Sequence, residues 1–438
     1  MLAAGAITAP ALLELYLDRI ARVDRELRAY RVVLTNSARR EAAAAQQLLD
    51  SGERLPLLGV PVAIKDDSDV AGEFTCYGST AYDLEATADS EVVSRLRAAG
   101  AVILGKTATT ECAYLAPTKT RNPHNPDHTP GGSSSGSAAA VAAGMVPLAL
   151  GTQTGGSVIR PASFCGVVGF KPTFGLIPRT GVLRTSRRLD TLGTFGRTIE
   201  DATLLADVLT GHDAGDPDTR PAAAPRLLDT ALSKPPVTPQ LAFLKTPAWP
   251  SIDADCAEGF GELVAALGDR CDEVELPRIF AEGASAHRRV MLAEMAHNLR
   301  PYYDRGHDRL AEQTRSAIEE GRAISATDYL AALDWRDTLY AGLGEIFERY
   351  DAIVTPAARG EAPAGLHSTG DAAFNVLWSF TGVPAVTLPL LTGANGLPIG
   401  VQLVGPRHDD GRLLRTARWL VETIAAGDSR DKTSEDER

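Results

Sequence analysis

Short apolar runs of strand length recur along this chain, and segments with helical periodicity separate them. Val60–Ile64 and Ala101–Gly105 are two such runs. Between them, Ser90–Ala99 has the apolar spacing of a helix, with Asp89 or Ser90 as its N-cap. A strand, a helix and a second strand in this order are typical of α/β proteins. A chain of 438 residues can bury a large core of this kind, so we predict an α/β fold.

The same patterns predict the remaining elements and the extent of the domain. They are helices at Pro10–Tyr30, Ser37–Asp50, Ala257–Leu267, Ala284–Tyr302 and Ala326–Tyr350, and strands at Leu241–Leu244, Ala352–Thr355, Ala385–Leu390 and Ile399–Val404. The segment His212–Pro239, rich in Pro, Ala and Asp, is expected to be a long surface loop. One domain is expected over residues 1–426. Residues 427–438, nearly all charged or small, are expected to form a disordered charged tail.

Composition limits the class of protein and its partners. The formal net charge of −12 argues against nucleic acid or an anionic membrane as the main partner. The five cysteines are odd in number and contain no C-x-x-C pair, so neither a disulfide framework nor a thiolate zinc site is indicated. No secretory signal or bilayer-spanning run is recognisable. We therefore expect a cytoplasmic protein, and a homodimer is compatible with the sequence.

Lys65 ends an apolar run that begins at Leu57, where a charge is costly to bury. A desolvated lysine can lose its proton, and the neutral amine can then activate a hydroxyl as a nucleophile. A lysine at a strand end is more often solvated, and Asp66 and Asp67 follow it at once and can pair with it. Lys65 is thus a candidate base whose role depends on hydroxyl groups elsewhere in the chain.

The first of two glycine-serine clusters spans Gly131–Ser137 and includes Ser133. Strings of this kind are often flexible linkers. This one leads directly into the helix former Ala138–Gly144, so its N–H groups would lie at a helix N-terminus. No lysine follows as in a nucleotide-binding P-loop. Ser134 matches the G-x-S-x-G elbow of α/β-hydrolases, but no later histidine lies in a supporting motif.

The second cluster, Gly151–Ser157, places a hydroxyl directly after two glycines. Because Gly155 and Gly156 have no side chains, N–H groups from Thr154 to Ser157 can converge on one point. Such donors stabilise the oxyanion of a tetrahedral intermediate, and the loss of one costs about 2.7–4 kcal/mol. The alternative is a tight turn with an incidental serine. With Lys65, the two clusters predict a serine hydrolase that uses lysine in place of histidine.

Longer motifs extend this pattern over nearly the whole chain. They are Gly59–Asp66, Thr120–Pro123, Pro130–Ser134, Gly151–Ser157, Arg160–Ala162, Phe164–Thr173, Leu189–Gly193, Thr198–Asp201 and Leu397–Gly405. In these stretches the chain resembles the amidase signature family. The resemblance implies that residues 1–426 are one large α/β domain with a central mixed β-sheet of roughly eleven strands covered by helices on both sides.

Carried over residue by residue, the resemblance implies a Ser-Ser-Lys triad. Ser157 is the implied nucleophile that forms an acyl-enzyme. Ser133, which a cis peptide bond precedes in this family, is the bridging serine, and Lys65 is the terminal base. Backbone N–H groups over Thr154–Ser157 are the implied oxyanion hole. The expected reaction is cleavage of the C–N bond of a small non-peptide amide, and no metal or organic cofactor is needed.

Two positions depart from the commonest family pattern. Many members have aspartate where this chain has Gln153, and arginine two residues after the nucleophile, whereas Arg160 lies three residues after Ser157. This placement is similar to members that act on small carboxylate-bearing amides, in which the arginine binds the carboxylate. A guanidinium suits a carboxylate bidentately. Arg160 can equally be a structural arginine that bridges loops.

Two other functions remain open from the sequence. One is the amidase (A) subunit of a tRNA-dependent amidotransferase, which releases ammonia from glutamine for a partner. Gln153 and the placement of Arg160 make this the less favoured interpretation. The other is an amide-forming acyltransferase that delivers the same acyl group to an amine, because the catalytic residues do not distinguish water from an amine as acceptor.

Overall fold

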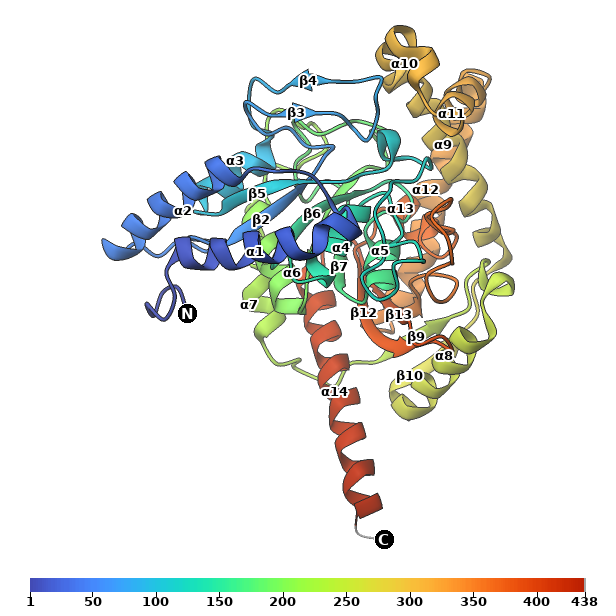
Figure 1. Ribbon diagram of the computed structural model, residues 1–438. Coiled ribbons are helices and arrows are strands. Elements are labelled where there is room, and N and C mark those ends of the chain that lie inside the picture. Colours follow the sequence, from blue (N-terminus) through green and yellow to red (C-terminus); the bar gives the residue numbers. More distant parts are fainter. Residues whose placement is uncertain (437–438) are drawn as a thin grey trace.

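The protein folds around one large β-sheet, seen in the computed structural model (Figure 1). The structure describes residues 1–436, with side chains described through residue 426. The sheet has 11 strands in the order β1-β5-β2-β6-β8-β7-β12-β13-β11-β9-β10. These strands are β1 (Tyr30–Val33), β2 (Pro61–Lys65), β5 (Val102–Thr107), β6 (Leu148–Gln153), β7 (Val168–Lys171), β8 (Thr191–Gly196), β9 (Leu241–Leu244), β10 (Cys271–Val274), β11 (Ala352–Pro356), β12 (Ala385–Thr392) and β13 (Pro398–Val404). A separate two-stranded sheet pairs β3 (Phe74–Thr75) with β4 (Leu84–Glu85).

The large sheet contains both parallel and antiparallel pairs. Strands β5, β2 and β6 are parallel neighbours, and so are β11, β9 and β10. Between these groups, β6, β8, β7, β12, β13 and β11 pair antiparallel. The predicted α/β fold with a mixed sheet is therefore confirmed. Since parallel strands end at the same edge of a sheet, the carboxyl ends of β2 and β6 lie close together.

Several helices begin at capping hydroxyls that the sequence supplies. Thr8 accepts a hydrogen bond from the N–H of Ala11 (3.2 Å), and Ser325 accepts one from the N–H of Asp328 (3.1 Å). The α-helices are α1 (Ala9–Leu27), α2 (Thr35–Asp50), α3 (Glu91–Ala98), α4 (Ser135–Ala142), α5 (Ile159–Cys165), α6 (Ile199–Leu209), α7 (Leu227–Leu232), α8 (Ala254–Leu267), α9 (Glu282–Asn298), α10 (Arg300–Gly306), α11 (Glu312–Arg322), α12 (Ala326–Phe347), α13 (Val376–Thr381) and α14 (Asp410–Asp436). The predicted disordered tail, residues 427–438, lies outside the residues whose side chains are described and stays a prediction.

Helices cover both faces of the sheet (Figure 1). One apolar core lies between the sheet and helices α3, α6, α7, α8 and α14. On the other face, α1, α2, α4 and α5 pack over the part that contains β5, β2 and β6. Helices α9, α12 and α13 pack over the part that contains β9, β11 and β12. Because both faces are covered, all five residues of β2 are buried, including its terminal lysine.

Two sequence predictions are wrong in detail. The predicted surface loop His212–Pro239 contains the short helix α7, which buries Leu227 and Ala231. A helix this short is only marginally stable on its own and depends on tertiary packing. The local sequence pattern therefore does not predict it. The single helix predicted over Ala284–Tyr302 is two helices, α9 and α10, because Pro301 starts a new helix in its first turn. The other predicted elements lie within a few residues of observed ones.

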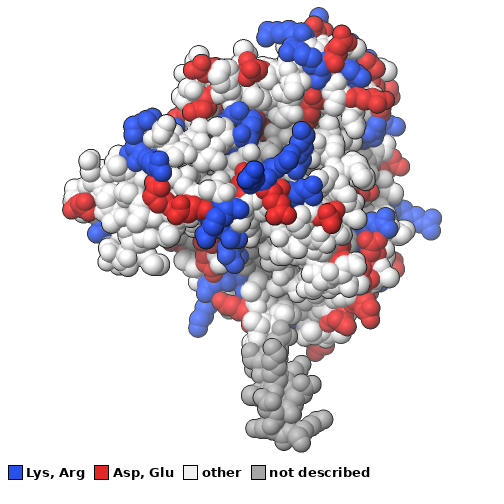
Figure 2. All heavy atoms as spheres, viewed as in Figure 1, with Lys and Arg blue, Asp and Glu red and all other residues white. Residues whose placement is uncertain are grey.

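The surface carries charges of both signs. On the face seen in Figure 2, acidic and basic side chains lie interspersed, without a broad basic patch. This face therefore offers no extended positive surface of the kind that binds a phosphate backbone. Within residues 1–436, no helix combines the length and apolar character needed to cross a membrane.

Candidate active site

The site begins where two parallel strands end side by side. Val62 of β2 pairs with Leu148 of β6, and Ala63 pairs with Ala149, so both strands end at the same edge. Lys65 is the last residue of β2, and its side chain is fully buried. Its Nζ lies 2.6 Å from the hydroxyl of Thr152 near the end of β6. The sheet thus places a buried amine at the carboxyl ends of its parallel strands, the edge at which α/β proteins commonly bind ligands.

Ser133 contacts the same amine from the loop that precedes α4. The distance from Lys65 Nζ to Ser133 Oγ is 2.8 Å. The Gly132–Ser133 peptide bond is cis. The carbonyl of Ser133 accepts a hydrogen bond from the N–H of Thr110 (3.3 Å), which anchors the loop. The lysine and the first predicted serine are therefore direct neighbours.

Of the two acidic residues after the lysine, only one pairs with it. Asp67 Oδ2 lies 3.0 Å from Lys65 Nζ and accepts a hydrogen bond from Thr152 Oγ1 (2.6 Å). Asp66 turns the other way and pairs with Arg31 (2.8 Å) and with a second lysine on β5. Burial lowers the pKa of Lys65, and the Asp67 carboxylate opposes that shift. The amine is therefore easier to deprotonate than a solvated lysine.

Ser157 lies on the loop between β6 and α5 and lines a cavity of about 640 Å³. Its carbonyl accepts a hydrogen bond from the N–H of Ser134 (3.4 Å), which ties the two serine clusters together. Within the described residues, no hydrogen bond joins the hydroxyls of Ser133 and Ser157. The N–H groups of Gly155, Gly156 and Ser157 likewise have no partner there. These three donors are free to bind a ligand at the cavity.

Gln153 fixes the start of the helix that follows the loop. Its Oε1 accepts hydrogen bonds from the N–H groups of Val158 (2.8 Å) and Ile159 (3.0 Å). Its Nε2 donates to the hydroxyl of Ser379 on α13 (3.0 Å). An aspartate at this position could accept from the helix, but it could not donate to Ser379. The amide therefore adds a link between the loop and α13.

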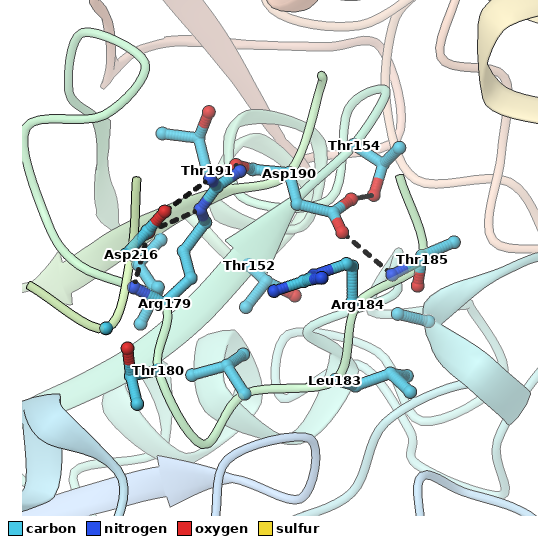
Figure 3. Close-up of a pocket in the computed structure, with 14 residues that line it drawn as sticks. Thr152, Thr154, Arg179, Thr180, Leu183, Arg184, Thr185, Asp190, Thr191 and Asp216 are labelled. Carbon is cyan, nitrogen blue, oxygen red and sulfur yellow. Dashed lines mark hydrogen bonds and ion pairs between the residues drawn. The ribbon is translucent and has the colours of Figure 1, made fainter. Parts of the chain in front are cut away.

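A second, much smaller cavity adjoins the same loop (Figure 3). Asp190 borders it and accepts hydrogen bonds from Thr154 Oγ1 (2.6 Å) and from the N–H of Thr185 (2.8 Å). Burial raises the pKa of Asp190 to about 6, and these hydrogen bonds oppose the shift. An ion pair between Arg179 Nε and Asp216 Oδ2 (2.8 Å) borders another side of this cavity. A volume of about 30 Å³ holds about one water molecule, so this cavity is too small for an organic ligand, unlike the cavity of about 640 Å³ that Ser157 borders.

Arg160 lies in the first turn of α5, is 3% exposed and lines the larger cavity. Its Nη2 donates to the carbonyl of Gly132 (2.6 Å) and to the hydroxyl of Thr369 (3.3 Å). Its Nε has no hydrogen-bond partner within the described part of the chain. Burial lowers the pKa of Arg160 to about 10, and Asp371 of the same cavity opposes that shift. The guanidinium thus holds the residue before Ser133, and its Nε–H stays unpaired within the described residues.

The structure does not support the alternative nucleophile Ser134. Its side chain is buried, and its Oγ bonds to the carbonyl oxygen and the N–H of Thr152 (both 3.3 Å). No histidine contacts it among the described side chains. His287 and His367 instead line the larger cavity. Nor do the described residues contain a cluster of His, Cys, Asp and Glu side chains that could hold a metal ion.

Three residues at the site have no sequence signal of their own. Thr152 lies inside the second glycine-serine cluster, but its spacing does not reveal that it contacts Lys65. His287 and Ser379 lie on α9 and α13, more than 130 residues further along the chain than the loop that they contact. Only the tertiary fold brings them to the site. A polar residue on the buried side of a helix was the one available clue, and it is a weak one.

Comparison with known proteins identifies the family. The profile of the family described as "Amidase" matches residues 11–414. A protein of Mycobacterium tuberculosis named "Putative amidase AmiB2" is 39% identical over 468 residues, which cover 96% of this chain and 94% of the relative. A glutamyl-tRNA(Gln) amidotransferase subunit of Clostridium acetobutylicum is 32% identical, with 92% and 93% covered. The solved structure of peptide amidase from Stenotrophomonas maltophilia has a TM-score of 0.79 and 28% identity, with 96% and 94% covered. The chain therefore belongs to the amidase family and is a hydrolase that acts on carbon–nitrogen bonds.

Proposed function

We propose that this amidase cleaves the C–N bond of a small non-peptide amide through an acyl-enzyme on Ser157, releasing ammonia or an amine. One observation carries the proposal: the buried Nζ of Lys65 lies 2.8 Å from Ser133 Oγ. Ser157 lies on the adjoining loop and borders a cavity of about 640 Å³. A cavity of this size suits a small organic substrate.

The contacts of Lys65 support its role as a base toward Ser133. A neutral amine has two N–H bonds and one lone pair. Thr152 Oγ1 donates its proton to Asp67, so it can only accept from Lys65, and the Asp67 carboxylate also only accepts. These two acceptors take the two N–H bonds. The lone pair is then left to face the hydroxyl of Ser133.

In the acylation step, Ser157 Oγ attacks the carbonyl carbon while its proton passes to Ser133. Ser133 passes its own proton to Lys65. The N–H groups of Gly155, Gly156 and Ser157 bind the oxyanion that forms. Collapse of the tetrahedral intermediate breaks the C–N bond, and the proton returns through Ser133 to the leaving amine. Water then attacks the ester by the same route and releases the carboxylic acid.

Arg160 is the proposed substrate contact. It is positively charged at neutral pH, lines the cavity and has an unpaired Nε–H. A carboxylate on the substrate could accept from the guanidinium, and Asp371 would compete for the same charge. Comparing matched amides with and without a carboxylate tests the contact. Arg160→Lys should raise KM for the acidic amide several-fold more than for the neutral one. Equal changes in both would assign Arg160 a structural role.

A panel of primary amides with detection of ammonia tests the proposed activity. Ser157→Ala should abolish turnover, and Ser134→Ala is the matched control in the neighbouring cluster. Mass spectrometry after rapid quenching should find the acyl group on the peptide that contains Ser157. Full turnover by Ser157→Ala, or an acyl group on another residue, would contradict the proposal.

The second candidate is the amidase component of a tRNA-dependent amidotransferase, which the 32% identity to an amidotransferase component favours. In that case the protein should co-purify with partner proteins, and release of ammonia from glutamine should depend on them. An isolated chain that turns over simple amides argues for the first candidate. The third candidate is an acyltransferase that delivers the acyl group to an amine. Adding hydroxylamine to the amidase assay tests it, since a hydroxamate that forms in place of most of the acid would indicate transfer of the acyl group to amines.

A cytoplasmic location is part of the proposal. All five cysteines are free thiols in the structure, and four of them are buried. Unpaired thiols favour a reducing compartment. Cell fractionation with an antibody against the protein tests the location, and size-exclusion chromatography with light scattering tests whether a homodimer forms.

A further inference from the structure

Three successive carbonyl groups of the loop before Ser157 are tied to the protein. The carbonyl of Thr154 accepts a hydrogen bond from His287 Nε2 on α9 (2.9 Å). The carbonyl of Gly155 accepts one from the hydroxyl of Ser379 on α13 (2.6 Å). The carbonyl of Gly156 accepts one from a backbone N–H in the first turn of α5 (2.9 Å). The loop is therefore held through its backbone oxygens.

The planar peptide bond turns these anchors into a constraint on the N–H groups. In a trans peptide the carbonyl and the N–H point in opposite directions. A fixed Thr154 carbonyl therefore fixes the N–H of Gly155, and a fixed Gly155 carbonyl fixes the N–H of Gly156. Glycine has the widest backbone freedom, so this segment would otherwise rotate easily. The two anchors from α9 and α13 supply the rigidity that glycine lacks.

His287 is suited to this task because it is a neutral donor. The ring is 3% exposed and meets the ring of Phe380 edge-on at 6.4 Å. Burial lowers the pKa of His287 to about 4, and the hydrogen bond to Thr154 opposes that shift. The carbonyl oxygen can only accept, so the proton of the neutral ring lies on Nε2. No second polar group within the described residues binds the ring.

We propose that His287, together with Ser379, is a positioning residue that aims the N–H groups of Gly155 and Gly156 at the oxyanion. This inference rests on the proposed function, because it assigns a catalytic task to those N–H groups. His287 acts through the Thr154 carbonyl and takes no proton from the substrate. Its contribution is therefore made in the transition state, where the charge on the oxygen has developed.

Two variants of His287 and one control on the same helix test the proposal. His287→Leu keeps a side chain of similar bulk but removes the donor, whereas His287→Gln retains an N–H donor. His297→Leu makes the same substitution at an exposed position of α9. Complete removal of an oxyanion donor lowers kcat by about 10²–10³-fold, so a misaimed donor should lower kcat by about 10–100-fold with little change in KM. His287→Gln should recover most of this loss, and His297→Leu should match the wild type.

Two inhibitors separate positioning from simple packing. An aldehyde analogue of the best substrate forms a tetrahedral adduct with an oxyanion, whereas the corresponding alcohol fills the same cavity without one. His287→Leu should weaken the aldehyde at least about tenfold and the alcohol less than about twofold. Ser379→Ala should likewise weaken binding of the aldehyde more than binding of the alcohol. This second variant keeps the test available if His287→Leu does not fold. Equal weakening of both inhibitors, or no change in either, would overturn the proposal.

The controls keep the inference distinct from the proposed function. If Ser157→Ala retains full turnover, the proposed function itself fails. If Ser157→Ala is inactive and His287→Leu keeps the wild-type kcat and inhibitor ratio, only the positioning role fails.

Discussion

The charge of Asp67 should set the pH at which this enzyme becomes active, and Asp67→Asn tests this directly. The substitution removes the charge beside Lys65 and keeps the shape. The new Oδ1 can still accept from Lys65 and Thr152, in place of the carboxylate oxygen that lies 3.0 Å from Nζ. The new amide group faces the hydroxyl of Ser68, which bonds to Asp67 in the native protein (3.2 Å) and can accept as well as donate.

The size of the effect follows from that distance. Unit charges 3.0 Å apart attract by about 5–6 kcal/mol at an effective dielectric constant of about 20. Relaxation of the surrounding protein and the dipole of the asparagine amide will offset part of the lost attraction. Burial already lowers the pKa of Lys65 and Asp67 opposes it, so removing the charge lowers the pKa further. One pH unit corresponds to 1.36 kcal/mol, so we expect the acidic limb of kcat/KM to move to lower pH by at least about one unit.

The assay is the pH dependence of kcat/KM for a neutral amide that does not itself titrate. Asp66→Asn is the matched control, because Asp66 is equally buried but pairs with Arg31 instead of Lys65. Its limb should stay at the wild-type pH even if the protein loses stability. A limb of Asp67→Asn that stays in place or moves to higher pH would show that Lys65 is not the group whose deprotonation starts the reaction.

The remaining predictions concern the relay, the loop and a second buried lysine. Ser133→Ala should lower kcat by about 10⁴-fold or more, and the double variant Lys65→Met/Ser133→Ala should be no slower than its slower parent, because the groups act as one unit. Steady-state kinetics checks both, and additive losses would contradict a shared relay. Gln153→Leu should lower the free energy of unfolding by about 2–4 kcal/mol in urea, since two buried N–H groups lose their acceptor. An unchanged midpoint would refute this. Burial lowers the pKa of Lys171 to about 7 from 10.5, with Asp410 opposing, so the contribution of Lys171 to the unfolding free energy should rise between pH 7 and 10 and level off below pH 7. Lys171→Met should reduce that slope, and an equal slope would exclude Lys171 as its source.

Strands with a continuous apolar run could be predicted from the sequence, whereas the strand Thr191–Gly196 could not. The strand Leu241–Leu244 has the bounds that its four apolar residues predict. The strand Thr191–Gly196 contains two glycines, which weaken strand propensity. Its glycine at 193 is required by the fold, because a Cβ there would lie 2.6 Å from the carbonyl oxygen of Phe170. Close approach between strands depends on tertiary packing, which a local pattern does not record.

The residues of the candidate site also fall into two groups, those that local sequence predicts and those that only tertiary packing brings to the site. Lys65 and the two serine clusters could be found from the sequence because strand ends and glycine loops have local signatures. Asp67 could be named as a partner for Lys65 because it follows so closely. His287 and Ser379 could not, since each is one polar residue on a helix, and its meeting with the loop depends on how α9 and α13 pack on the sheet.

This division explains why motifs can identify the chemistry of a family member while leaving its substrate open. The proposed reacting groups all lie on segments near the carboxyl ends of β2 and β6, within the first half of the chain. Much of the cavity wall comes instead from α9, from residues 367–373 and from α13. These segments can change their side chains without disturbing Lys65, provided that the hydrogen bonds from His287 and Ser379 to the loop are kept or replaced. The two anchors therefore connect this part of the cavity wall to the proposed reacting groups, and a change of substrate specificity that disturbs either of them should appear first as a loss of kcat.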